Sequence, residues 1–190
     1  MDVTSATRRQ IPVTGTPEQL MQDILGRLVG IIEGDVKGFN HDAHEAIEKL
    51  AKLGQTEALK ICLLNPKVED LFKSAIVKQL VQLQDLTAVE PIVQYLLEVR
   101  SEDKLDTYLR LDTVSQALSK LDIPQVAKGQ VAQILEAFYW KFDFDYKYAS
   151  GTVRQRIEQL KGGKMISPFL ERREVVQRQL DESLRARVKF

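Results

Sequence analysis

The chain has 190 residues, of which 44% are hydrophobic and 28% charged, and its 27 basic side chains balance its 27 acidic ones. This is the composition of an ordinary globular domain with a sizeable core, which excludes a disordered chain. The charge is uneven, because residues 1–150 carry 17 Lys and Arg against 22 Asp and Glu, whereas residues 151–190 carry 10 against 5. The basic end favours recognition of an acidic partner, and the acidic body argues against nucleic acid.

Cys62 is the only cysteine, so an internal disulfide is excluded and a reducing compartment is expected. No apolar leader follows Arg8 and Arg9, and Arg27 and Glu33 interrupt the most apolar stretch. We therefore expect a cytoplasmic protein without a membrane span.

The first 15 residues lack apolar periodicity and are expected to form a flexible arm. A helix should then begin with Thr16 as its cap, Pro17 in its first position and Gln19 completing a capping box. Its predicted apolar stripe consists of Leu20, Ile24, Leu25, Leu28, Ile31 and Ile32. Glycines recur every four residues along this helix, at 26, 30 and 34. They indicate either close contact with another helix or, as we favour, only a helix end at Gly34.

Three helical hairpins are predicted after this helix. The middle one, residues 72–97, is the clearest, because apolar residues recur at helical spacing on both sides of a short turn at residues 84–86. Thr87 should cap its second helix, with Glu90 completing a capping box and Pro91 in the first turn.

The two flanking hairpins are less regular. In the first, Asp42 is expected to cap a helix, with Glu45 answering it and Gly54 ending it, and a return helix should run over residues 56–64. The third should consist of helices over residues 105–121 and 126–139. The residues predicted to face the core of the hairpins are Ala43, Ile47, Leu50, Leu53, Ile76, Val77, Leu80, Val81, Leu83, Val89, Ile92 or Val93, Leu96, Leu97, Tyr108, Leu111, Val114 or Ser115, Leu118, Leu121, Val131, Ile134 and Leu135.

The turns of the hairpins carry related sequences: Leu-Ala-Lys-Leu-Gly ending at 54, Leu-Val-Gln-Leu-Gln ending at 84 and Leu-Ser-Lys-Leu-Asp ending at 122. Ala58, Ala88 and Val126 follow them, so the repeats are offset by 30 and 38 residues, as in helical-repeat proteins. Residues 80–93, which read LVQLQDLTAVEPIV, resemble the short HEAT repeats of phycobilisome lyases. The outer repeats depart from that pattern because neither has the proline after the small residue.

The resemblance covers about residues 42–137, and the fold it implies is an all-α, right-handed HEAT-like solenoid. Proteins built this way present a curved helical surface to other proteins. We therefore expect a non-catalytic scaffold, adaptor or assembly factor that binds another protein, whose identity and the oligomeric state stay open. The alternative implied by the resemblance is a phycobilin lyase-type subunit acting on a phycobiliprotein in a cyanobacterial source, although no bilin-handling residue can be assigned.

An aromatic run follows the last hairpin, and residues 138–148 hold seven of the thirteen aromatic side chains. Aromatic and charged residues alternate from 142 to 148, which predicts an extended segment with one aromatic face. This face could cap the open end of the solenoid or form a binding hot spot. The partner-binding candidates in the run are Trp140, Phe142, Phe144, Tyr146 and Tyr148.

Residues 151–190 are predicted to form a basic helical extension packed on or beside a repeat domain of residues 16–150. Val153, Ile157 and Leu160 mark a short helix that Gly162 and Gly163 end. A last helix from Pro168 carries alternating charges, and Arg172 and Arg173 are its candidates for holding an acidic partner. It could dock on the repeats or bind in trans, and docking is the default.

Residues suited to catalysis or metal binding are few. His41 and His44 adjoin two carboxylates, but no distant third ligand is apparent, so we predict no metal site. No phosphate-binding glycine loop and no nucleophile–base pair can be identified, and Cys62 is expected to be buried. We predict no cofactor, and a catalytic role is less favoured than a binding one.

Overall fold

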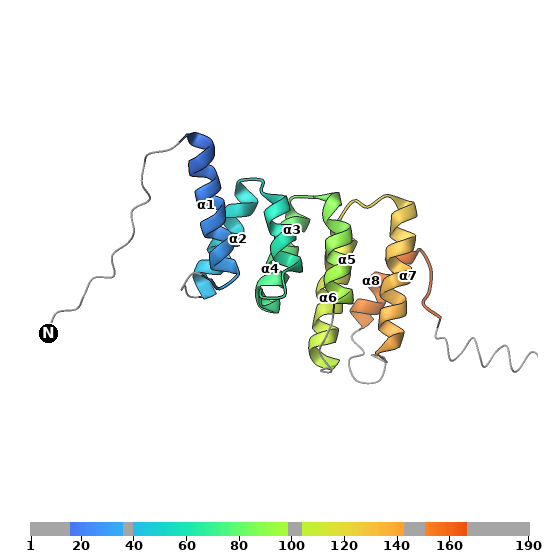
Figure 1. Ribbon diagram of the computed structural model, residues 1–190. Helices are drawn as coiled ribbons and strands as arrows, with labels where there is room; N and C mark the ends of the chain where they lie inside the picture. Colours follow the sequence, from blue (N-terminus) through green and yellow to red (C-terminus); the bar gives the residue numbers. More distant parts are fainter. Residues whose placement is uncertain (1–15, 36–39, 99–103, 143–150, 167–190) are drawn as a thin grey trace, which may run out of the picture.

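A computed structural model describes residues 16–35, 40–98, 104–142 and 151–166, and within these ranges the chain is all helical, without a strand (Figure 1). The predicted all-α class is therefore confirmed. The elements are α1 Pro17–Ile32, α2 Asn40–Lys52, α3 Thr56–Leu64, α4 Asp70–Gln82, the 3-10 turn η1 Leu86–Ala88, α5 Val89–Leu97, α6 Lys104–Lys120, α7 Gln125–Lys141 and α8 Gly151–Lys161.

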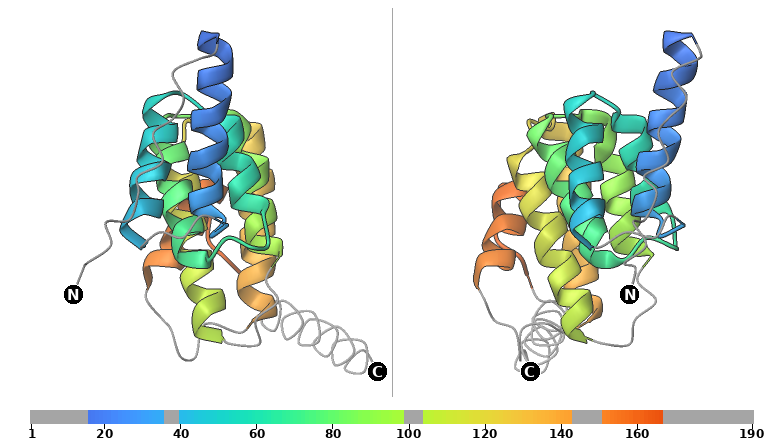
Figure 2. Two further views of the ribbon diagram at one scale, coloured as in Figure 1. Left: turned by 60° about the vertical axis from the view of Figure 1, so that its left-hand side comes forward. Right: turned by 90° about the vertical axis from the view of Figure 1, so that its left-hand side faces the viewer.

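The helices lie side by side in two layers, as Figure 1 shows, and the chain alternates between the layers. In one layer α1 packs on α3 and α3 on α5, with α7 beyond them, and in the other α2, α4, α6 and α8 follow one another. The layers are joined by contacts between consecutive helices, such as α1 with α2 and α7 with α8. Figure 2 shows that the first half of α1 rises beyond the ends of the other helices.

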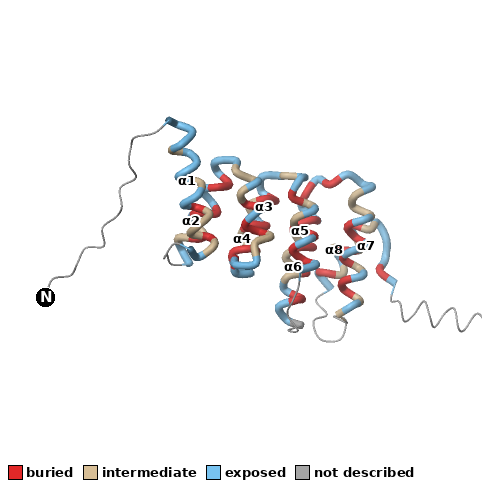
Figure 3. The backbone as a smooth tube through the Cα atoms, in the orientation of Figure 1, coloured by how far each residue is buried: buried red, intermediate tan, exposed pale blue. Residues whose placement is uncertain are grey.

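One hydrophobic core runs between the two layers (Figure 3). Every described helix contributes to it, because each has apolar residues at helical spacing on the face that meets the opposite layer. The largest fully buried side chains are Tyr95, Ile32, Ile47, Leu50, Leu59, Leu63, Ile76, Leu80, Ile92, Leu96 and Leu111. Three residues of α8, Val153, Ile157 and Leu160, belong to the same core.

The turns after α2 and α4 have the same backbone structure, as their related sequences predict. Gly54 has φ +68° and Gln84 has φ +52°, both left-handed. The amide of the next residue closes each turn: Gln55 N donates to Leu50 O at 2.9 Å, and Asp85 N donates to Leu80 O at 3.3 Å. The third turn differs, since the Leu121 amide bonds to Ala117 O and the Ile123 amide to Leu121 O.

The first helix begins as predicted. Thr16 and Gln19 form a reciprocal capping box, and Pro17 occupies the first helical position. The helix ends at Gly34, whose φ of +76° suits glycine. At Gly26 an added Cβ would meet no atom within 4 Å, so the described residues show no close helix contact there.

Two predicted helix caps are wrong. Asp42 lies inside the first turn of α2, which already begins at Asn40, where its charge suits the positive end of the helix dipole. Thr87 does not cap α5. Instead Asp85, two residues before Thr87, caps η1, because its side chain accepts a hydrogen bond from the Thr87 amide at 3.0 Å. Pro91 does lie in the first turn of α5.

Several residues predicted to face the core are exposed instead. They lie at helix ends or beside gaps between helices, where no opposing helix covers them. They are Ile24, Leu53, Leu83, Leu97 and Ile134, with exposed fractions of 38%, 44%, 40%, 57% and 36%.

Candidate protein-binding grooves

The structure describes two of the seven predicted binding residues, Trp140 and Phe142. Trp140 lies in the last turn of α7 and Phe142 directly after the helix, and both are half-buried against the core. The other candidates, Phe144, Tyr146, Tyr148, Arg172 and Arg173, lie outside the described residues, as does the predicted arm of residues 1–15.

The prediction that Phe142 begins an extended segment is wrong. Helix α7 continues to Lys141, and Phe142 has φ −99° and ψ 1°, which is not an extended conformation. The physical reason is packing at helical spacing: the Phe142 ring lies 4.8 Å from that of Phe138, one turn earlier. The Trp140 ring meets the Tyr139 ring edge-on at 5.3 Å.

An apolar groove of about 640 Å³ lies between α5 and α7, which we call the α5–α7 groove. It forms because these two neighbouring helices are held by α6 in the other layer and make little direct contact. Among the lining residues Glu90 is the one charged side chain. The apolar lining consists of Leu86, Val89, Val93, Leu97, Ala127, Val131 and Ile134.

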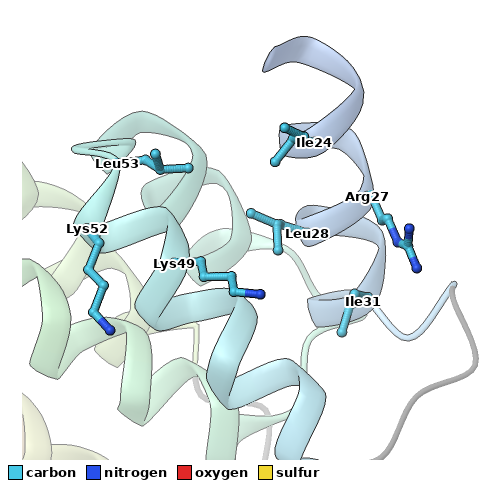
Figure 4. A pocket seen from close by; sticks show the side chains of 7 residues that line it. All are labelled: Ile24, Arg27, Leu28, Ile31, Lys49, Lys52 and Leu53. Carbon is cyan, nitrogen blue, oxygen red and sulfur yellow. The ribbon is translucent and has the colours of Figure 1, made fainter. Parts of the chain in front are cut away.

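A second groove, of about 500 Å³, lies between α1 and the end of α2, which we call the α1–α2 groove (Figure 4). Its floor is apolar, with Ile24, Leu28 and Ile31 from α1 and Leu53 from the turn after α2. Three cationic side chains, Arg27, Lys49 and Lys52, complete its lining. Figure 4 shows Leu28 and Leu53 pointing into the gap from opposite sides and Lys49 extending toward α1.

Lys60 is a cation with only 9% of its side chain exposed, and it joins α3 to η1. Its ammonium pairs with Glu57, donates to Thr87 Oγ1 at 2.6 Å and lies 3.6 Å from Asp85 Oδ2. The hydrogen bond to Glu57 raises the pKa of Lys60 more than burial lowers it. These groups contact one another between α3 and η1, so the cluster has the character of a structural contact.

His41 and His44, which adjoin two carboxylates in the sequence, have different neighbours in the structure. His41 Nε2 lies 3.3 Å from Glu45 Oε1, whereas the His44 ring meets the Phe72 ring edge-on at 5.5 Å. Within the described part of the chain, no three His, Cys, Asp or Glu side chains are grouped as metal ligands would be.

The prediction that Cys62 is buried is confirmed. Burial, with a smaller effect of the Glu33 charge, raises the pKa of its thiol to about 11. A thiol with this pKa is almost wholly protonated at neutral pH and is therefore a poor nucleophile.

The two grooves were missed by the sequence reasoning. Leu53, Leu86 and Leu97 end helices or lie in turns, and their spacing alone does not show whether another helix covers them. A signal for the α1–α2 groove was present, because Lys49 and Lys52 follow one face of α2 next to apolar positions.

No family model matches the chain, and neither the curated proteins nor the solved structures provide a match. None of the described helices combines the length and apolar character needed to cross a membrane.

Proposed function

We propose that this protein is a non-catalytic scaffold or adaptor, built as a HEAT-like helical solenoid, that binds another protein in the α5–α7 groove. The two-layer order of helices and the matched turns at Gly54 and Gln84 support the solenoid. The proposed partner contributes an apolar segment, most simply one face of a helix.

The observation that carries this proposal is the apolar lining of an open groove. Leu97 is 57% exposed and Ile134 is 36% exposed, although the interior beside them is closely packed. Exposing contiguous apolar surface to water is costly, so such surface usually marks a binding site. A groove between two helices suits an amphipathic helix, which buries its apolar face and leaves its polar face in water.

The proposal is tested by replacing exposed lining residues, whose loss should leave the fold intact. The double variant Leu97→Ser with Ile134→Ser is compared with Ile61→Ser, a 64% exposed residue of α3 that lines neither groove. Proteins retained from native lysate by the three immobilised chains are quantified, and circular dichroism confirms equal folding. We expect a retained protein that the double variant loses and the control keeps. Equal retention by all three chains would contradict a binding role for this groove.

A second candidate, a phycobilin lyase-type subunit, has its support in the sequence of residues 80–93 alone. It predicts binding of a phycobiliprotein and transfer of a bilin, which is measured by mixing the purified proteins with bilin and following covalent attachment. The aromatic run and the pair Arg172 and Arg173 stay predictions of additional partner contacts.

A further inference from the structure

The α1–α2 groove lies at the opposite end of the array from the α5–α7 groove, where α1 is the edge helix (Figure 1). The apolar stripe of α1 continues past the groove, since Met21, one turn before Ile24 and two turns before Leu28, is 40% exposed. The first part of α1 also extends beyond α2, as Figure 2 shows. An apolar strip about two helical turns long is thus open to a second helix.

The lining of this groove is positively charged. It includes Arg27, Lys49 and Lys52 and no carboxylate. Among the described residues, neither Arg27 nor Lys49 forms a salt bridge. Lys52 pairs with Glu48 at 3.8 Å, and both side chains are more than half exposed, so this pair costs little to exchange for another carboxylate.

We propose that the α1–α2 groove binds an amphipathic helix of a partner protein whose apolar stripe is flanked by Asp or Glu. The stripe packs on Ile24, Leu28 and Leu53, and the carboxylates pair with the three cations at the rim. This inference rests on the proposed protein-binding role but concerns a second, separate site.

The positive charge of the groove argues against occupation by the terminal segments of the same chain. The segments outside the described residues at the two ends carry net positive charge, with two basic residues against one acidic in 1–15 and six against four in 167–190. Either segment would bring like charge to the groove. A symmetric pair of α1–α2 grooves would likewise bring Arg27, Lys49 and Lys52 of two copies together, which is unfavourable.

A membrane surface fits the geometry less well. The apolar residues lie on the floor of a concave groove, whereas helices that bind bilayers present an apolar face rich in aromatic anchors on the outside. The lining of this groove contains no aromatic side chain.

The test uses the full chain and a pair of fluorescent synthetic helices of about 16 residues, long enough for four turns. Both peptides have the same leucine stripe, and the flanking positions are Glu in one and Lys in the other. We expect saturable binding of the Glu peptide, at least about tenfold tighter than that of the Lys peptide, because several rim pairs contribute. Raising the salt from about 50 to about 500 mM should weaken it, since exposed charges are screened.

Two double variants with the same change in net charge localise the effect. Arg27→Glu with Lys49→Glu should weaken binding of the Glu peptide by about tenfold or more. Lys78→Glu with Lys120→Glu, exposed residues of α4 and α6, should have a much smaller effect. The variant Leu97→Ser with Ile134→Ser should keep Glu-peptide binding, which separates failure at this groove from failure of the proposed function.

Three results would overturn the proposal. Equal affinity for the two peptides, or equal loss in the two charge-reversal variants, would show that the groove does not select acidic helices. Self-association in analytical ultracentrifugation that Ile24→Ser abolishes would assign the groove to a second copy. Binding to phosphatidylserine vesicles without saturable peptide binding would assign it to a membrane.

Discussion

Gln84 adopts a left-handed backbone conformation that its counterpart, Gly54, adopts without strain. A non-glycine residue in this conformation costs roughly 1–2 kcal/mol of stability, so we expect the Gln84 side chain to form contacts that offset this cost. The side-chain nitrogen of Gln84, Nε2, donates hydrogen bonds to Val81 O and to Lys120 O, and its Oε1 accepts a hydrogen bond from the Asp122 amide. The side chain therefore ties the turn after α4 to the turn after α6.

Replacing Gln84 separates these two effects. Gln84→Ala keeps the left-handed strain and loses the bridge, so the free energy of unfolding should fall by about 1 kcal/mol. Gln84→Gly also loses the bridge but removes the strain, and its stability should stay within about 0.5 kcal/mol of the wild type. Both are measured by urea unfolding.

Gly54→Ala is the matched control for the glycine effect. An added Cβ at Gly54 meets no atom within 4 Å, so its cost of about 1 kcal/mol comes from the positive φ alone. If Gln84→Gly proved as destabilising as Gln84→Ala, backbone strain at this turn would be unimportant.

Asp85 predicts a pH dependence of stability. Burial of its carboxyl raises the pKa, but the hydrogen bonds from the Thr87 side chain and amide, with the Lys60 charge, outweigh it, so the pKa lies below its ordinary value of 3.8. A carboxyl whose pKa is lowered by folding stabilises the protein above pH 3.8, and this contribution is lost as the pH falls through the lowered value.

Asp85→Asn should therefore lower the free energy of unfolding at neutral pH by about 1.5–3 kcal/mol, the usual contribution of hydrogen bonds to a charged group. Its difference from the wild type should shrink as the pH falls below 3.8. Unfolding is followed by urea titration at a series of pH values. A difference independent of pH over this range would show that the negative charge of Asp85 does not stabilise the fold.

The helices themselves were largely predictable, because each packs a stripe of apolar residues that recur at helical spacing. The predicted return helix at residues 56–64 coincides with α3, and α8 buries the three residues that marked it. The sequence did not show which end of an apolar stripe extends past the neighbouring helices and is therefore exposed. Leu96 and Leu97 look alike in the sequence, yet one is fully buried and the other faces the α5–α7 groove.

The grooves could not be predicted for the same reason, since a groove is a property of the spacing between helices that are distant in sequence. Glu90 and Ile134 line the same groove although 44 residues separate them. The aromatic run was misjudged at its start, because the alternation at residues 142–148 also permits Phe142 to pack on Phe138 one helical turn back.

Substitutions at Leu96 and Leu97 test which face of α5 is buried. Leu96→Ala should reduce the free energy of unfolding by about 2–5 kcal/mol, because it leaves a cavity in the core. Leu97→Ala should change it by less than about 0.5 kcal/mol, since the side chain is mostly exposed. Chemical denaturation of the two variants measures both values, and similar losses would mean that the face of α5 is misassigned.

The two-layer array makes each helix depend on its neighbours, and this holds for the helix at the C-terminal end of the described residues as well. Helix α8 closes one end by packing on α6 and α7. Arg156 Nη1 lies 2.5 Å from Asp112 Oδ1 of α6, and Lys161 Nζ lies 2.6 Å from Glu136 Oε2 of α7. Together with the buried face of α8, these contacts indicate that α8 unfolds with the array.

Ile157→Ala tests this dependence. Ile157 is fully buried, so the variant should lose about 2–5 kcal/mol in global stability. If α8 unfolds with the array, the most slowly exchanging amides of α4 should lose protection by the same free energy, although α4 lies two helices away from α8 in its layer. Native-state hydrogen exchange measures this residue by residue. Faster exchange confined to α8, with α4 unchanged, would instead make α8 a separately unfolding extension and place a stability boundary near residue 150.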